Sequence, residues 1–153
     1  MAMWLYQLSA EKEFEDGSKW TPEVHREEVW EGQYLEWDTR QIRSLRSGTK
    51  PTAGDTVIYW FVKRGIDEPG LYDSGIIFEY NQDEETIKHL PIFPSAYLKM
   101  HPIYDDDMIE LVKGIQNRMP IATMFEINDD HAQKLWIKIR NWIIHFSEIQ
   151  SNE

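Results

Sequence analysis

The chain has 153 residues, a formal net charge of −11, 41% hydrophobic residues and no cysteine. This length suits one domain with an adequate core, and the missing cysteines exclude disulfide frameworks and thiolate catalysis. The charge excludes indiscriminate coating of nucleic acid, and no apolar run is long enough to span a bilayer. We therefore expect one cytoplasmic domain over residues 1–150, with a tail at 151–153 and no membrane partner.

The first third of the chain predicts two strands and two short helices. Residues 3–8 alternate as a strand does, and residues 21–23 favour a short helix because proline suits its first position. Residues 33–37 alternate again. Residues 38–48 then predict a helix, with a capping side chain at its start and a glycine at its end.

The middle of the chain is rich in strand signals. Residues 56–62 are continuously apolar, β-branched and aromatic, which predicts a central strand. Residues 71–80 predict a second strand, in which Gly75 indicates a bulge or a close backbone approach. Residues 86–93 and 123–127 complete the predicted strands.

Two further helices are predicted in the last third. The aspartates at 105–107 precede a helix that ends near Gly114, and a helix N-terminus explains them better than a metal does. Asn128 or Asp129 caps the last helix. Its predicted apolar stripe consists of Ala132, Leu135, Trp136, Ile139, Trp142, Ile143 and Phe146.

The basic residues are concentrated in one segment. Residues 40–64 hold six basic groups against one aspartate, a local balance of +5, so the rest of the chain carries −16. Arg40, Arg43 and Arg46 follow a helical i, i+3, i+6 spacing and would form a ridge along the predicted helix. By itself such a cluster is more commonly a solvated helix face.

Signals for catalysis are few. The five histidines include no metal-binding pair, and Ser74 lacks the flanking glycines of a nucleophile elbow. We therefore expect surface or packing histidines and no cofactor. The absence of such motifs favours a protein that is not an enzyme.

Three features occur in order along the chain: the opening strand at 3–9, Trp37 before an arginine-bearing helix, and the run Gly54-Asp55-Thr56-Val57-Ile58-Tyr59-Trp60 before the strand at 70–77. Together they resemble the EVE domain, a member of the PUA-like superfamily that also contains YTH and ASCH domains. The resemblance implies a single α+β domain, a bent β-barrel of about five to six strands flanked by helices. It also implies a non-catalytic, monomeric reader of DNA or RNA that holds a flipped, modified base, for example a methylated one.

The same resemblance implies roles for individual residues. Trp37, Trp60 and Tyr72 would form an aromatic base pocket, and Ser9 would contact the base edge. Phosphate contacts would come from Arg40, Arg43, Arg46, Lys63 and Arg64. For each tryptophan, packing in the core is an equally good explanation, and a serine at a strand end is commonly a turn residue.

Two other functions stay open on the residues alone. A hydrolase acting on a modified nucleoside would need scattered carboxylates such as Glu36, Asp38 and Asp73. A protein-interaction module would use the acidic surface to bind a basic partner. Restriction or defence-system proteins are the partners that the resemblance implies.

Overall fold

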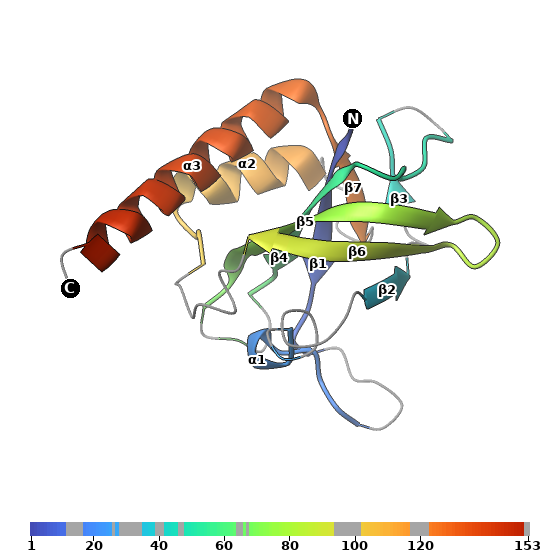
Figure 1. Cartoon of the computed structure of the whole chain (residues 1–153), viewed down its shortest axis with the longest axis horizontal. Helices are drawn as coiled ribbons and strands as arrows, with labels where there is room; N and C mark the ends of the chain where they lie inside the picture. The colour runs from blue at the N-terminus through green and yellow to red at the C-terminus, as the bar shows by residue number, and fades with distance from the viewer. Residues whose placement is uncertain are drawn as a thin grey trace.

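The computed structural model describes residues 1–11, 17–25, 27, 35–38, 42–45, 48–63, 66, 68–93, 102–116 and 123–151; of residues 35–38, 43, 91, 93 and 146–151 it describes only the backbone. In these ranges it contains seven strands and three helices (Figure 1). In chain order they are β1 (Met3–Leu8), α1 (Pro22–His25), β2 (Leu35–Asp38), β3 (Ile42–Arg43), β4 (Thr56–Phe61), β5 (Gly70–Asn81), β6 (Thr86–Phe93), α2 (Asp106–Gln116), β7 (Met124–Ile127) and α3 (Asp129–Ser151).

The strands form one mixed sheet in the order β2-β6-β5-β4-β1-β7-β3. Strand β4 is fourth in this order, which confirms the predicted central strand. It pairs in parallel with β1 and antiparallel with β5. Its continuous apolar run is explained by this position, because both faces of β4 are covered.

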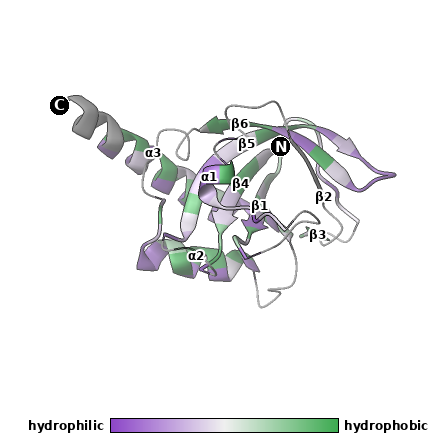
Figure 2. Ribbon diagram, turned by 90° about the horizontal axis from the view of Figure 1, so that it is seen from below, coloured by the Kyte–Doolittle hydropathy of each residue, from purple (hydrophilic) through white to green (hydrophobic). Residues whose placement is uncertain are grey.

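The sheet is strongly curled. Strands β2 and β3 stand at opposite ends of the strand order, yet only residues 39–41 connect them. In a flat sheet these edges would lie about 29 Å apart, whereas a connection of this length spans at most about 14 Å. The strands therefore curve into the bent, barrel-like sheet that the sequence resemblance implied, seen from below in Figure 2.

Side chains on the two faces of the sheet form two cores. The helical core contains Ile58 and Trp60 of β4 and the buried residues of α2 and α3. The aromatic core contains Val57, Tyr59 and Phe61 of the same strand. This alternation follows from the two-residue period of a strand, so neighbouring residues of β4 serve different cores.

The run Gly54-Asp55 fixes the start of the two central strands. The Asp55 carboxylate is buried and accepts N–H groups from the Ala2 backbone (3.0 Å), the Trp4 indole (3.0 Å) and the Thr52 backbone (2.9 Å). Gly54 has a φ of 95°, which a side chain rarely tolerates. The most specific part of the family-like motif therefore has a structural role, since it joins β1 to the turn before β4.

The helix predicted over residues 38–48 is wrong where the structure describes it. Ile42 and Arg43 form strand β3, which pairs in parallel with Met124 and Phe125 of β7. The Leu45 backbone N–H also donates a hydrogen bond to the Glu126 carboxylate at 2.8 Å. Backbone pairing with a distant strand outweighs the local helical spacing, because propensity is a weak prior against tertiary contacts.

The other predicted helices are confirmed, and each has a capping side chain. The Thr21 hydroxyl accepts the Val24 N–H (3.2 Å) at α1, and the Asn128 side chain accepts the His131 N–H (2.8 Å) at α3. The stripe of α3 is only partly buried: Leu135 is fully buried, but 42% of Trp136 is exposed. Among the described residues no helix is long and apolar enough to cross a membrane.

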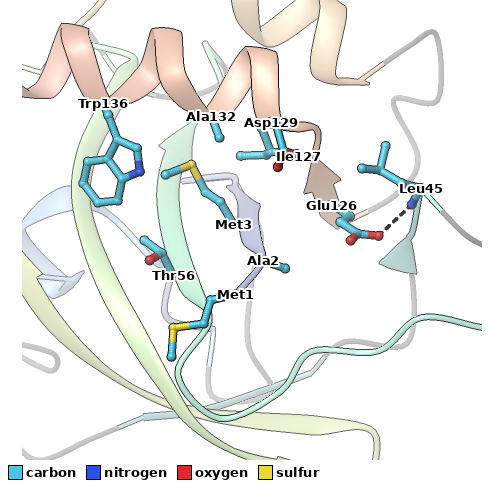
Figure 3. Close-up of a pocket in the computed structure, with 10 residues that line it drawn as sticks. All are labelled: Met1, Ala2, Met3, Leu45, Thr56, Glu126, Ile127, Asp129, Ala132 and Trp136. Atoms are coloured by element: carbon cyan, nitrogen blue, oxygen red, sulfur yellow. Dashed lines mark hydrogen bonds between the residues drawn. The ribbon is translucent and has the colours of Figure 1, made fainter.

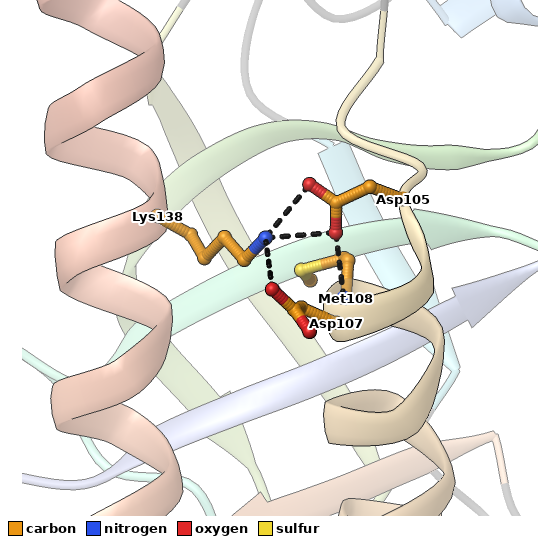
Figure 4. Close-up of polar contacts among 4 residues, drawn as sticks. All are labelled: Asp105, Asp107, Met108 and Lys138. Carbon is orange, nitrogen blue, oxygen red and sulfur yellow. Dashed lines mark hydrogen bonds and ion pairs between the residues drawn. The ribbon is translucent and has the colours of Figure 1, made fainter.

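Helix α2 begins at a cap that also joins it to α3. The Asp105 carboxylate accepts the Met108 N–H at 2.8 Å and the Lys138 ammonium at 2.7 Å (Figure 4). Asp107 lies 3.9 Å from the same ammonium. Burial alone would raise the pKa of Asp105, but the hydrogen bonds from Lys138 and Met108 outweigh it and lower that pKa. The aspartate run is thus a cap, as the sequence predicts.

Candidate functional site

Two predicted site residues lie at the carboxyl ends of the central parallel strands. Ser9 directly follows β1, and Lys63 follows β4 after one residue. The Val62 N–H donates to the Leu8 carbonyl at 2.9 Å, which continues the β1–β4 pairing to this edge. Ser9 is half-buried and Lys63 is exposed. The Ser9 hydroxyl also accepts the Glu11 N–H at 3.4 Å, as a turn serine does.

Tyr72, a second aromatic candidate, is 6% exposed in β5, beside the end of β4. Its ring contacts Phe61, the last residue of β4, edge to face at 5.0 Å, and its hydroxyl donates to the Glu68 carbonyl at 2.5 Å. Burial raises the pKa of Tyr72, and the negative charges of Glu68, Glu23 and Asp73 raise it further. The phenol therefore stays neutral and serves as a hydrogen-bond donor near neutral pH.

Trp60 lies on the other face of the sheet. It is 5% exposed in the helical core, and its ring centre is 6.0 Å from that of Tyr104. Tyr72 belongs to the aromatic core, so the structure does not bring these two predicted pocket walls together. The Trp60 side chain points to the opposite face from those of Tyr59 and Phe61, as alternation along a strand requires. Its position therefore matches core packing, which was the other explanation that the sequence allowed.

The remaining predicted site residues are only partly described. The backbone of Trp37 pairs with Ile87 of β6, and that of Arg43 pairs with Phe125 of β7. Their side chains lie outside the described part of the chain. The same holds for every atom of three predicted phosphate contacts: Arg40, Arg46 and Arg64. The roles of these five residues stay predictions.

A buried polar cluster lies beneath α1 on the aromatic face. His25, the last residue of α1, is fully buried, and its Nε2 lies 2.9 Å from Oδ2 of the fully buried Asp73 in β5. The Trp20 indole N–H donates to His25 Nδ1 at 3.3 Å. Because an indole only donates, Nδ1 accepts and the imidazole proton is assigned to Nε2, facing Asp73.

Tyr59 and His89 form the second half of this cluster. The Tyr59 hydroxyl and His89 Nδ1 are 2.5 Å apart, and the Tyr59 ring contacts the His25 ring at 5.1 Å. Burial, and then the charge of Asp73, raises the pKa of Tyr59 well above its usual value. Burial, and then His25, lowers the pKa of His89 to about 3. Both side chains are therefore neutral near pH 7.

The cluster holds α1 against the sheet. Its histidines are packing residues, as expected, but their partner Asp73 was not found by sequence reasoning because it lies 48 positions beyond His25. Asp73, the aspartate proposed for a hydrolase, is thus fully buried against His25 Nε2, and the side chains of Glu36 and Asp38 lie outside the described residues. Within the described ranges, no three acidic or histidine side chains are grouped to hold a metal ion.

The architecture defines a fold class, an α+β domain built on one curled, mixed sheet. No family model and no curated protein matches the sequence. The DUF55 domain of human thymocyte nuclear protein 1 shares the fold, with a TM-score of 0.50 and 12% identity over 87% of this chain and 95% of that chain. At such identities the likeness concerns the fold alone.

Two further solved structures align over most of both chains. Human THYN1 in complex with DNA containing 5-methylcytosine aligns over 88% of this chain and 95% of its own, with a TM-score of 0.49 and 12% identity. A protein from Pseudomonas putida aligns over 92% of this chain and 99% of its own, with a TM-score of 0.48 and 11% identity.

Proposed function

We propose that the protein is a non-catalytic reader that binds DNA or RNA and holds one flipped, modified base at the carboxyl ends of β1 and β4. Ser9 contacts the base edge and Lys63 contacts the backbone phosphate. Trp37 supplies the aromatic face from β2, across the curled sheet, and Tyr72, which is 6% exposed, backs the site from the aromatic core. This division of labour follows general recognition physics, in which phosphate contacts position the chain and base contacts specify it. Trp60 is left to the core.

The proposal rests on one observation: Ser9, which carries a hydroxyl, and Lys63, which carries a cation, lie at the same edge of the sheet. The pairing of Leu8 with Phe61 brings the residues after both strands together, so Ser9 and Lys63 lie at the same edge of the sheet, next to the last residues of two strands that reach the aromatic core. A base taken out of its stack needs these groups: an aromatic face, a few polar contacts and a cation for its phosphate.

The charge distribution favours weak backbone affinity with selectivity for the base. A net charge of −11 opposes phosphate binding over most of the surface, whereas residues 40–64 carry the local excess of +5. Neutralising only a few phosphates gives a shallow salt dependence. The difference in affinity between modified and unmodified oligonucleotides should therefore persist at salt concentrations that weaken both.

The direct test is a titration with labelled oligonucleotides, single-stranded and duplex, DNA and RNA, each with and without modified bases. 5-Methylcytosine DNA is a suitable first probe, since human THYN1 has been solved with it. We expect tighter binding of one modified oligonucleotide than of its unmodified match. Equal binding of every matched pair at low salt would contradict the proposal.

Variants separate the two kinds of contact. Trp37→Ala should reduce the preference for the modified base by about 1–3 kcal/mol, the value of one stacking contact, and Ser9→Ala should reduce it less. Lys63→Ala should weaken matched oligonucleotides equally. Lys50→Ala is the control, because Lys50 is also exposed but precedes β4 and so lies at its other end. If Trp37→Ala and Lys63→Ala behaved alike, the assigned roles would be wrong.

The resemblance further implies restriction or defence-system proteins as partners of such a reader. We propose that any partner of this kind binds together with the modified nucleic acid. Size-exclusion chromatography of the protein with and without a modified oligonucleotide tests the accompanying expectation that the reader itself is a monomer.

A further inference from the structure

A pocket lies at the opposite end of the central strands from the proposed base site. It has a volume of about 470 Å³ and is lined by the start of β1, the start of β4, the end of β7 and the first turns of α3 (Figure 3). Ligand pockets are typically about 300–1,000 Å³. Six residues of β1 place it about 20 Å from Ser9. We call it the α3 pocket, and it lies outside the proposed function.

One wall of the α3 pocket is apolar and aromatic. Met1, Met3 and Ala132 line it, and the indole of Trp136 points toward Met3 and Thr56 (Figure 3). Trp136 was expected in the buried stripe of α3, yet 42% of it is exposed. The helix therefore presents one of its two tryptophans to an open pocket, where a ligand can cover it.

The other wall carries two carboxylates. The Glu126 carboxylate lies at the pocket, where it accepts the Leu45 N–H at 2.8 Å. Asp129, the first residue of α3, also lines the pocket. Among the described side chains no ion pair includes either carboxylate. The helix N-terminus contributes only about half a positive charge, which is smaller than the two negative charges. The pocket therefore favours a cation.

We propose that the α3 pocket binds a lysine or arginine side chain from a basic segment of a partner protein. Such a side chain joins a long apolar stem to a cationic head. The stem would lie along Met3 and Trp136, where the indole also attracts a cation, and the head would reach Glu126 and Asp129. The net charge of −11 selects the same partner, because it attracts a basic segment and repels a phosphate backbone.

The test uses the full chain and a fluorescein-labelled peptide of alternating glycine and lysine, followed by fluorescence anisotropy at low salt. The matched control peptide carries acetylated lysines, which keep the stem and lose the charge. We expect the lysine peptide to bind about tenfold or more tightly than the acetylated one. Trp136→Ala and Glu126→Gln should each weaken it about fivefold, in line with one cation–π or ion-pair contact.

Matched variants outside the pocket make the outcome decisive. Glu126→Gln removes a charge but keeps an acceptor for the Leu45 N–H, so the fold is preserved. Glu84→Gln removes the same charge at the exposed β5–β6 turn, and Ile144→Ala truncates an apolar side chain of α3 that is 49% exposed. We expect both controls to bind the peptide as the unchanged protein does.

Three results would overturn the proposal: equal binding of the acetylated peptide, equal losses for Glu84→Gln and Glu126→Gln, or loss of oligonucleotide rather than peptide binding in Trp136→Ala. As a second readout, the Trp136 indole N–H resonance, assigned with Trp136→Phe, should shift on addition of the lysine peptide. Ser9→Ala should leave peptide binding unchanged, so that failure here and failure of the base site can be told apart.

Discussion

His89 is fully buried beside Tyr59, and burial lowers its pKa to about 3 from a usual value of 6.5. The unfolded chain therefore binds a proton at this residue between those two values, while the folded protein does not. Its contribution to stability is complete above about pH 6.5 and is lost as the pH falls toward 3. We expect the free energy of unfolding to fall in this window by up to about 1.4 kcal/mol per pH unit.

Urea unfolding at several pH values measures this slope. His89→Gln removes the titrating group and should flatten the slope between pH 6.5 and 4, although it lowers stability at pH 7 through the lost contact with Tyr59. His145→Gln is the control, because His145 is exposed. An unchanged slope in His89→Gln would show that other groups cause the acid sensitivity.

Asp55 carries the second prediction at the scale of residues. Its buried carboxylate accepts three N–H hydrogen bonds. In asparagine an NH₂ group replaces one of the two oxygens, so this donor would face an N–H donor and neither would be satisfied. We expect Asp55→Asn to lower the free energy of unfolding by about 1–3 kcal/mol, the cost of an unsatisfied buried donor. Chemical denaturation beside the exposed variant Asp83→Asn measures the difference, and equal stabilities would contradict this explanation of the motif.

Among the elements, the β5 strand depends on a glycine. The register with β6 shifts between Ser74 and Gly75, and a Cβ at Gly75 would lie 2.3 Å from the Tyr59 hydroxyl and 2.6 Å from the Leu90 carbonyl. The predicted bulge or close approach is therefore confirmed in both respects. Gly75→Ala must shift the backbone of β6 and should cost about 1–3 kcal/mol or more.

A double variant tests which contact limits residue 75. Tyr59→Phe removes the hydroxyl but leaves the Leu90 carbonyl, so it should rescue Gly75→Ala only in part. Gly114→Ala provides the control, because its Cβ would meet the end of the His131 side chain at 3.3 Å, and alanine favours a helix by about 1 kcal/mol. Thermal unfolding compares them, and full rescue by Tyr59→Phe would exclude the backbone contact as the cause.

Helix α2 is stabilised at its first turn by Asp105. Asp105→Ala removes the acceptor for the Met108 N–H and should cost about 1 kcal/mol, as for other N-caps. Because the pKa of Asp105 is lowered, its contribution is present above the usual value of 3.8 and is lost as the pH falls through the lower folded value. Asp105→Asn keeps the cap and should lose only the Lys138 contact; equal losses in urea unfolding would indicate that capping contributes little.

At the scale of the whole molecule, pairing within the sheet determines the secondary structure of the basic segment: Ile42 and Arg43 form a strand and not a helix. Its sequence has helical spacing around Arg43, but β3 completes the sheet by pairing with β7, which lies more than 80 positions further along the chain. The sheet is curved as well, because β2 and β3 lie at opposite ends of the strand order but are separated by only three residues in the sequence. The partner strand lies far outside the local sequence around Arg43, so local helical spacing could not indicate that this segment pairs as a strand.

The sequence alone determined the elements whose signals are local: the alternation of β1, the apolar run of β4, the glycine in β5, the cap in the aspartate run at 105–107, and a cap at Asn128 or Asp129. It also placed Ser9 and Lys63 after two strands. Tertiary structure alone decided the rest, because the deciding contacts join distant residues. It put Trp60 and Tyr72 in different cores and buried Asp73 against His25. It also left Trp136 partly exposed at a pocket, although the helical period places this side chain in the buried stripe of α3.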